Sequence, residues 1–302
     1  MDAVLRTPDE AFSDLPDYPF SPNYLTVTDP ALGDLRVHYL DEGSGPVVLL
    51  LHGEPSWSFL YRKMIPPLVA AGFRCVAPDL VGFGRSDKPA RREDYTYSGH
   101  LNWLTQTLNA LELDQIHLFC QDWGGILGLR LVAAEPERFA SVCASNTILP
   151  TGQGEPSTAF IKWRDFSQSV PEFPTGKIIE TGCARPFSDS VKAAYDAPYP
   201  DESFKAGARA FPPLVPITAD IDGATENREA WKTLAAYERP FLTLFGDSDP
   251  IMAGVEKFFQ SRVPGCQGQP HAIIAQAAHF IQEDAGEELT THLIPWLQSQ
   301  TA

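Results

Sequence analysis

The chain has 302 residues, and 39 acidic against 23 Lys and Arg residues give a formal net charge of −16. This charge argues against binding nucleic acid or an anionic membrane through a broad basic face, because neutralising phosphates takes clustered Lys and Arg. Hydrophobic residues make up 43% of the chain, which is enough for a core and excludes global disorder. The longest aliphatic run, Val47–Leu51, is far too short to span a membrane.

The cysteines and the N-terminus favour a cytoplasmic protein. The five Cys are scattered and form no Cys-x-x-Cys pair, so we expect neither a disulfide scaffold nor a zinc site. The first residues lack the basic start and apolar stretch of a secretion signal. No clustered metal ligands and no phosphate-binding loop occur, and the glycines of Asp79–Ser86 lack the third glycine of a dinucleotide fingerprint. We therefore expect no metal and no cofactor.

Short β-rich runs alternate with helix-like stretches along most of the chain. Val47–Leu51 shows no polar alternation, which is typical of a central strand buried on both faces. The alternation predicts an α/β fold with a mostly parallel sheet covered by helices on both faces. The expected strands are Leu35–Leu40, Val47–Leu51, Phe73–Ala77, Ile116–Cys120, Ala140–Ala144, Pro240–Phe245 and Ala272–Ala275. The expected helices are Trp57–Ala71, Tyr97–Leu111, Gly124–Ala134, Ile251–Arg262 and Glu283–Gln298.

The alternation stops between about residues 151 and 232, where aromatic residues and prolines dominate and no strand is evident. Strand-like segments resume afterwards and would complete one sheet. We therefore expect a core of residues 1–150 and 233–302, with residues 151–232 inserted as a helical cap over the carboxyl edge of the sheet, where active sites of open α/β sheets lie. The alternative is an unrelated appended domain.

The segment Cys120-Gln121-Asp122-Trp123-Gly124-Gly125 follows a strand and opens a helix. Small residues around the central position permit the crowded turn of a nucleophile elbow. Its centre is Asp122, whose ionised form the helix N-terminus favours. A carboxylate needs no base to attack a saturated carbon, and it would form an alkyl ester on the enzyme. The alternative is that Asp122 merely caps the helix.

The segment His52-Gly53-Glu54-Pro55 follows the buried strand Val47–Leu51. A loop at this place and the residue after the nucleophile each supply a backbone N–H to an oxyanion hole. The donors would be the amides of Glu54 and Trp123. Alone, the segment also fits an ordinary turn at a strand end.

A carboxylate and a histidine complete the predicted triad. Asp249 lies in the turn Phe245–Pro250 after a late strand, where a carboxylate can orient a histidine. Asp247 is the alternative, although its position fits a turn residue. His279 follows the last expected strand, so the order nucleophile, acid, histidine is that of an α/β-hydrolase triad.

Two tryptophans and several cap residues suggest a dry cavity. An indole N–H is a pure donor, so Trp123 and Trp163 together could hold a departing halide. The alternative for Trp163 is packing within the core. A wall of the substrate pocket could come from Phe160, Phe166, Phe211 and Pro212, for which packing within the cap is the alternative.

Taken together, the chain resembles the haloalkane dehalogenases of the α/β-hydrolase superfamily, and most closely their subfamily I, the 1,2-dichloroethane-dehalogenase-like group. The resemblance runs nearly end to end, and Glu54 and Gln121 are particular to subfamily I. It implies that Asp122 is the nucleophile, His279 the base and Asp249 the acid, with Trp123 and Trp163 as the halide-binding pair. It also implies a small haloalkane and water as substrates, a halide ion as product, and no cofactor. The segments that carry it are Leu5–Asp9, Tyr18–Pro22, His52–Trp57, Tyr61–Pro66, Gly82–Pro89, Gln121–Gly125, FIKWRD at residues 160–165, Asp196–Asp201 and His279–Glu283.

Three other functions fit part of the pattern. An epoxide hydrolase also uses an Asp nucleophile, and Tyr195 and Tyr199 could serve as its acid donors. A fluoroacetate dehalogenase would be expected to have Arg where Trp123 stands. A non-catalytic sensor of small apolar ligands would need no triad, and an assay of halide release separates it from an enzyme.

Overall fold

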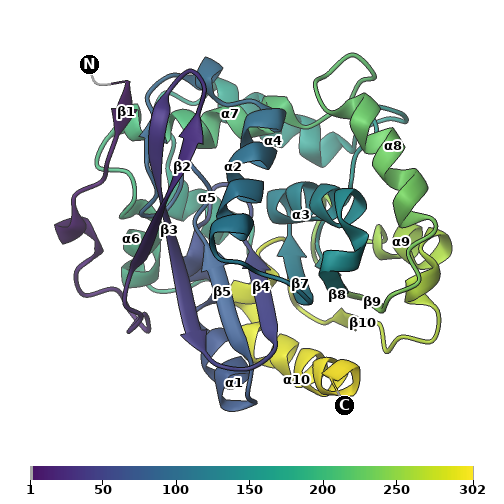
Figure 1. Ribbon diagram of the computed structural model, residues 1–302. Helices are drawn as coiled ribbons and strands as arrows, with labels where there is room; N and C mark the ends of the chain where they lie inside the picture. Colours follow the sequence, from purple (N-terminus) through teal and green to yellow (C-terminus); the bar gives the residue numbers. More distant parts are fainter. Residues whose placement is uncertain (1–2, 302) are drawn as a thin grey trace.

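The computed structural model describes residues 3–301 and contains an eight-stranded sheet in the order β10-β9-β8-β7-β4-β5-β3-β2 (Figure 1). The strands from β10 to β5 run parallel, whereas β3 pairs antiparallel with both β5 and β2. The sheet is therefore mostly parallel, as predicted. Its strands are β2 (Asn23–Asp29), β3 (Gly33–Gly43), β4 (Val47–Leu51), β5 (Arg74–Pro78), β7 (Ile116–Gln121), β8 (Phe139–Ser145), β9 (Phe241–Gly246) and β10 (Ala272–Ile274), and a separate ribbon pairs β1 (Val4–Leu5) with β6 (Lys88–Pro89).

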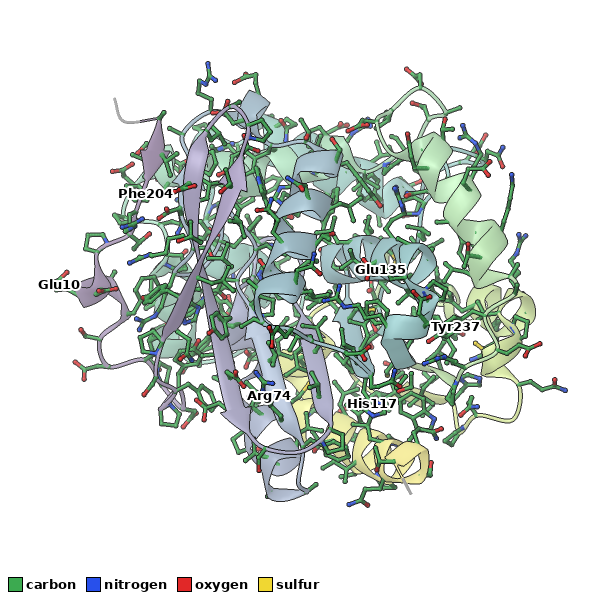
Figure 2. The ribbon with its side chains drawn as sticks, in the orientation of Figure 1. Glu10, Arg74, His117, Glu135, Phe204 and Tyr237 are labelled. Atoms are coloured by element: carbon green, nitrogen blue, oxygen red, sulfur yellow. The ribbon has the colours of Figure 1, made fainter. Side chains whose placement is uncertain are left out.

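Helices cover both faces of the sheet, and side chains fill the space between the layers (Figure 2). In β4, Leu49 and Leu51 join one buried cluster, while Val48 and Leu50 join another on the opposite face. This explains the unbroken apolar run. No helix within residues 3–301 is both long and apolar enough to cross a membrane. The helices are α1 (Ile65–Ala70), α2 (Tyr97–Ala110), α3 (Trp123–Ala134), α4 (Thr158–Ser169), α5 (Thr175–Thr181), α6 (Asp189–Asp196), α7 (Ala206–Leu214), α8 (Ala224–Leu234), α9 (Glu256–Arg262) and α10 (Ile281–Thr301).

All seven expected strands are present, but two expected helices are much shorter. The stretch Trp57–Ala71 holds a 3-10 turn and the short α1, because Pro66 and Pro67 lack the N–H groups that would continue a helix from upstream. The stretch Ile251–Arg262 becomes helical only at Glu256, after Gly254 with φ +88°. The antiparallel strand β2 was not predicted; it pairs with β3 along its whole length.

Five helices, α4 to α8, lie between β8 and β9, and the described part of residues 151–232 contains no strand. In Figure 1, α4 and α7 lie beyond the ends of the central strands. The expected boundary at residue 232 falls inside α8 and would have to be moved past Leu234. The division into core and cap otherwise stays a prediction.

A buried ion pair joins three parts of the fold. Glu283 in α10 accepts two hydrogen bonds from the Arg62 guanidinium, at 2.7 and 2.8 Å, and one from Lys63 at 2.8 Å. The Tyr195 hydroxyl of α6 donates to the same carboxylate at 2.7 Å. Burial opposes the charge, but Arg62 and Lys63 hold the pKa of Glu283 below its usual value.

Glu283→Gln should lower the free energy of unfolding by about 3–5 kcal/mol, because Arg62 would stay buried without a counter-charge. Urea unfolding measures this loss. The matched control is Glu229→Gln in the exposed Glu229–Lys232 pair, which should change little. Equal effects of the two substitutions would contradict the assignment.

Candidate active site

The chain turns sharply between β7 and α3, and Asp122 stands at the corner with φ 50° and ψ −126°. The glycines around Asp122 are required because neighbouring atoms leave no room for a side chain at their positions. A Cβ on Gly124 would overlap the carbonyl of Leu51, and one on Gly53 would overlap the side chain of Asp122. The small residues of the sequence pattern therefore mark a close approach of two loops at the carboxyl ends of β4 and β7.

Each oxygen of the Asp122 carboxylate lies near a hydrogen-bond donor. The backbone N–H of Glu54 donates to Oδ1 at 2.8 Å. The Nε2 atom of His279 lies 3.5 Å from Oδ2. The backbone of Asp122 is also held, because the Thr147 hydroxyl donates to its carbonyl at 2.7 Å. The structure thus brings together the predicted nucleophile, one predicted oxyanion donor and the predicted base.

Asp249 lies behind His279 and is almost completely buried. Its Oδ2 atom accepts from His279 Nδ1 at 2.8 Å and from the side-chain amide of Asn146 at 2.8 Å. Burial alone would raise the pKa of Asp249, but the neighbouring His279 and these hydrogen bonds hold it at about 2. Asp247, the alternative, is exposed and accepts from Ser248 and the backbone of Gln276, as a turn residue does.

Opposing influences act on the imidazole of His279. Burial would lower its pKa, but the negative charges of Asp249 and Asp122 raise it well above 6.5. In the free protein the two carboxylates therefore favour the cationic form of His279. Removing the charge of either carboxylate would make the ring a better base.

The carboxyl group of Glu54 lies in the same site, where its surroundings disfavour the charged form. Burial, and then the negative charge of Asp122, raises the pKa of Glu54 well above 4.5. The side chain lines the cavity described below, and its Oε1 atom is buried without a hydrogen-bond partner among the described residues.

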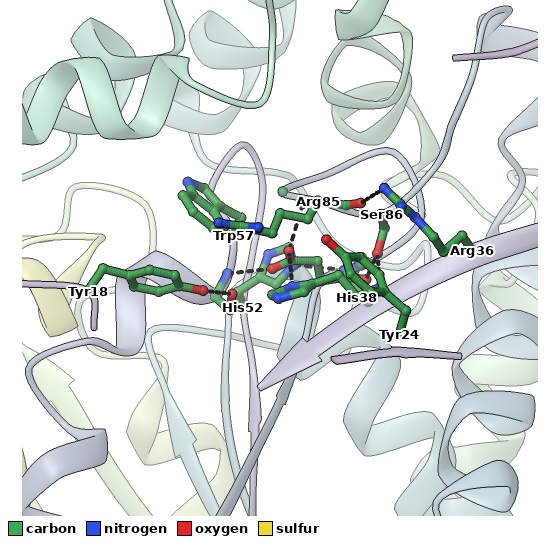
Figure 3. Close-up of polar contacts among 12 residues, drawn as sticks. Tyr18, Tyr24, Arg36, His38, His52, Trp57, Arg85 and Ser86 are labelled. Atoms are coloured by element: carbon green, nitrogen blue, oxygen red, sulfur yellow. Dashed lines mark hydrogen bonds and ion pairs between the residues drawn. The ribbon is translucent and has the colours of Figure 1, made fainter. Parts of the chain in front are cut away.

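A buried polar network fixes the loop that carries Glu54. Asp79 accepts from His38 at 2.7 Å and from the backbone N–H groups of Ser58 and Arg85 at 2.8 Å. Burial would raise the pKa of Asp79, but His38 beside it holds the value at about 2. His52 accepts the N–H of Leu80 at 3.0 Å. Figure 3 shows His38, His52, Arg85 and Ser86 meeting in this network, which ties the oxyanion loop to the loop after β5.

A mostly apolar cavity of about 1310 Å³ opens above these groups. Asp122, Trp123, Asp249 and His279 line it from the strand ends. Of the expected pocket residues, Phe160, Phe166 and Pro212 line the cavity, as does Trp163.

Phe211 does not line the cavity, contrary to expectation. It is fully buried behind Trp123, with ring centroids 4.4 Å apart in an edge-on arrangement. It supports the indole of Trp123 from the far side, because a rigid ring filling that space limits rotation of the indole.

The indole N–H groups of Trp123 and Trp163 differ from those of the other four tryptophans. Trp57, Trp103, Trp231 and Trp296 each donate to a protein oxygen, at distances between 2.8 and 3.2 Å. Trp123 and Trp163 donate to no acceptor within residues 3–301, and both line the cavity. Two pure donors on residues that line the cavity are therefore left without an acceptor among the described residues.

A family model described as "alpha/beta hydrolase fold" matches residues 46–286. A haloalkane dehalogenase of Psychrobacter cryohalolentis is 55% identical over 296 residues, which cover 97% of this chain and 98% of that protein. One of Mycolicibacterium paratuberculosis is 49% identical, with 98% and 99% covered. The solved structure of a tetrameric haloalkane dehalogenase from Paraglaciecola agarilytica NO2 matches with a TM-score of 0.89 and 36% identity, covering 98% of both chains.

The chain belongs to the haloalkane dehalogenases. The predicted resemblance is thereby confirmed at the level of the family, and the predicted α/β-hydrolase fold with it. The assignment to subfamily I stays a prediction.

The relatives give no support to the alternative of an epoxide hydrolase, and the placement of the tyrosines does not favour it. That rival needs tyrosine hydroxyls in the cavity as acids. Tyr195 donates instead to the carboxylate of Glu283, and neither Tyr195 nor Tyr199 lines the cavity.

Sequence reasoning missed Asn146 and one wall of the cavity. Asn146 directly follows β8 with φ 39°, and a polar residue at the carboxyl end of a central strand is the signal that would have found it. The missed wall consists of Met252, Val255 and Phe258, which follow Asp249 in the chain. Within residues 3–301, no group of three or more His, Cys, Asp or Glu is placed to hold a metal ion.

We expect Trp123→Phe and Trp163→Phe each to weaken bromide binding by about 10- to 100-fold, because a hydrogen bond to a charged group contributes roughly 1.5–3 kcal/mol. Quenching of the remaining tryptophan fluorescence measures the affinity. Trp103→Phe is the control, since its N–H is already used by Asp29. Unchanged bromide affinity in either cavity variant would remove that residue from the halide site.

Proposed function

We propose that this dehalogenase hydrolyses small haloalkanes to an alcohol and a halide ion through an alkyl ester on Asp122. The observation that carries the proposal is the arrangement of Asp122, His279 and Asp249 at a cavity that Trp123 and Trp163 also line, both with indole N–H groups that have no acceptor among the described residues. The high identity to named haloalkane dehalogenases over the whole chain supports the same reaction.

In the first step, Asp122 attacks the carbon that bears the halogen. The Glu54 amide holds Oδ1, so Oδ2 is the attacking oxygen. A C–O bond forms as the C–halogen bond breaks, and the halide leaves with the bonding electrons. The indole N–H groups of Trp123 and Trp163 stabilise the charge that develops on it, because they can donate but offer no competing negative charge. No proton transfer is needed.

In the second step, His279 takes a proton from a water molecule, which attacks the carboxyl carbon of the ester. The negative charge that develops on the carboxyl oxygen is stabilised by the Glu54 amide, which already donates to Oδ1, and by the amide of Trp123 as the second donor that the sequence predicts. As this intermediate collapses, the bond between the carboxyl carbon and the alkyl-bearing oxygen breaks. The leaving alkoxide takes the proton of the new carboxyl group, which gives the alcohol and restores the Asp122 carboxylate. Asp249 orients the imidazole and stabilises its cationic form.

The charge of Asp122 links ester formation to the protonation of His279, which acts in ester hydrolysis. Esterification neutralises Asp122, which is one of the two anions that raise the pKa of His279. The imidazole therefore loses its proton more readily after the first step, when the second step needs a base.

His279→Phe should release one halide per active site from 1,2-dibromoethane and then stop, leaving an ester on Asp122. Intact-mass and peptide mass spectrometry detect the adduct. His292→Phe, on the exposed surface of α10, is the control and should turn over normally. Continued turnover of His279→Phe without an adduct would refute the assigned roles.

The pKa of His279 should be lower in the ester than in the free enzyme. The rate of ester hydrolysis in a single turnover falls as pH drops through the pKa of the ester form, because only the neutral imidazole accepts a proton. Quench-flow measurement of that rate gives one value, and an NMR titration of the imidazole in the free enzyme gives the other. Equal values would mean that Asp122 does not control the protonation of His279.

A further inference from the structure

The catalytic histidine lies in an irregular loop that no sheet ladder supports. Residues 275–280 separate β10 from α10, and Gln276 within them has φ 55°. Contacts from other parts of the chain hold this loop in place. The backbone N–H of Ser248 donates to Ala277, and the N–H of Ala278 donates to Asp284 at 2.9 Å.

Two buried side-chain amides from the sheet hold the next two carbonyl groups of this loop. Asn146, after β8, donates to the carbonyl of Ala278 at 3.0 Å. Gln121, the last residue of β7, donates to the carbonyl of His279 itself at 3.0 Å. Neither amide is exposed to solvent. Within residues 3–301, Gln121 is the only partner of the His279 carbonyl.

Gln121 and Asp122 are neighbours in the chain, so the same strand end carries both the nucleophile and the donor that holds the base. Because Asp122 has a positive φ, its side chain and that of Gln121 point to different places. The carboxylate of Asp122 lies in the cavity, whereas the amide of Gln121 is buried against the histidine loop. Any shift of the β7 end therefore moves both partners together. The 3.5 Å separation between Asp122 and the imidazole is protected by this connection.

We propose that Gln121 is a positioning residue for His279 and that it acts in ester hydrolysis rather than in ester formation. The proposal rests on the proposed two-step function, in which only the second step uses the imidazole. Asn146 also donates to Asp249, so its loss would disturb the acid and the base at once. Gln121 donates to the backbone of the base alone, which makes it the informative position.

The test is Gln121→Met, which keeps the length of the side chain and removes the donor. We expect kcat with 1,2-dibromoethane to fall by about 10- to 100-fold, since misplacing a catalytic group by 1 Å costs roughly 100-fold. The ratio kcat/KM, set by ester formation and halide release, should stay unchanged, so KM falls with kcat. Rapid-quench mass spectrometry should show the Asp122 ester accumulating in the steady state.

Gln282→Met is the matched control. Gln282 is equally buried and close in sequence to His279, but among the described residues its amide donates only to Tyr61, at 3.5 Å. It should lower the midpoint of thermal unfolding without ester accumulation. If Gln121→Met behaves like this control, or if kcat and kcat/KM fall together, the positioning role is wrong.

Two further measurements keep the result decisive. If the methionine variant does not fold, Gln121→Glu tests the same bond. Its carboxyl group donates only while protonated, so the excess of ester over that in the unsubstituted enzyme at the same pH should grow as pH rises. Absence of that pH dependence overturns the proposal. If the ester accumulates in His279→Phe but not in the Gln121 variants, only the role of Gln121 is rejected. If no variant accumulates the ester, the proposed two-step function is itself rejected.

Discussion

The backbone conformation of Asp122 is the constraint on which the site depends. A non-glycine residue with φ 50° costs free energy, of the order of 1–3 kcal/mol for such strained residues, and persists only where its surroundings enforce it. Here the surroundings are tight: Gly53 and Gly124 leave room for no additional carbon atom. In return, the carboxylate stands at the N-terminus of α3 and within 2.8 Å of a backbone donor from another loop. The same kink turns Gln121 away from the cavity.

The distribution of charge follows from this crowding. Three carboxyl groups, those of Glu54, Asp122 and Asp249, lie around one imidazole. If all three were ionised, the site would hold two uncompensated negative charges with little solvent. Burial keeps the pKa of Glu54 high, while the neighbouring His279 and hydrogen bonds hold the pKa of Asp249 at about 2. These surroundings favour a neutral Glu54 and a cationic His279 between Asp122 and Asp249.

The sequence predicted those parts of the molecule that local rules determine. The central strands are apolar runs, and the elbow is recognisable because its glycines are required at fixed positions. The preference for Asp249 over Asp247 came from spacing within a turn, and the structure places only Asp249 against the imidazole. The bounds of the first helix were wrong because two prolines and tertiary packing outweigh helix propensity.

Residues that act through distant contacts were not predictable in the same way. Phe211 and Pro212 are adjacent in α7, yet only Pro212 lines the cavity, because direction on a helix changes by about 100° per residue. Asn146 reaches both the acid and the histidine loop through contacts more than 100 residues away in sequence. Such contacts depend on the order of strands in the sheet. The residue pattern of one segment carries no information about that order.

The residues with a proposed chemical role and the residues of the cavity wall also differ in which substitutions they tolerate. Every group with a proposed chemical role apart from Trp163 lies at the carboxyl end of a core strand, where a displacement of 1 Å is costly. By contrast, Phe160, Phe166 and Pro212 contribute surface only, and apolar residues of similar volume can replace one another at modest cost. Changes of substrate range are therefore expected to arise in residues 151–232, while the reaction stays fixed by the strand ends.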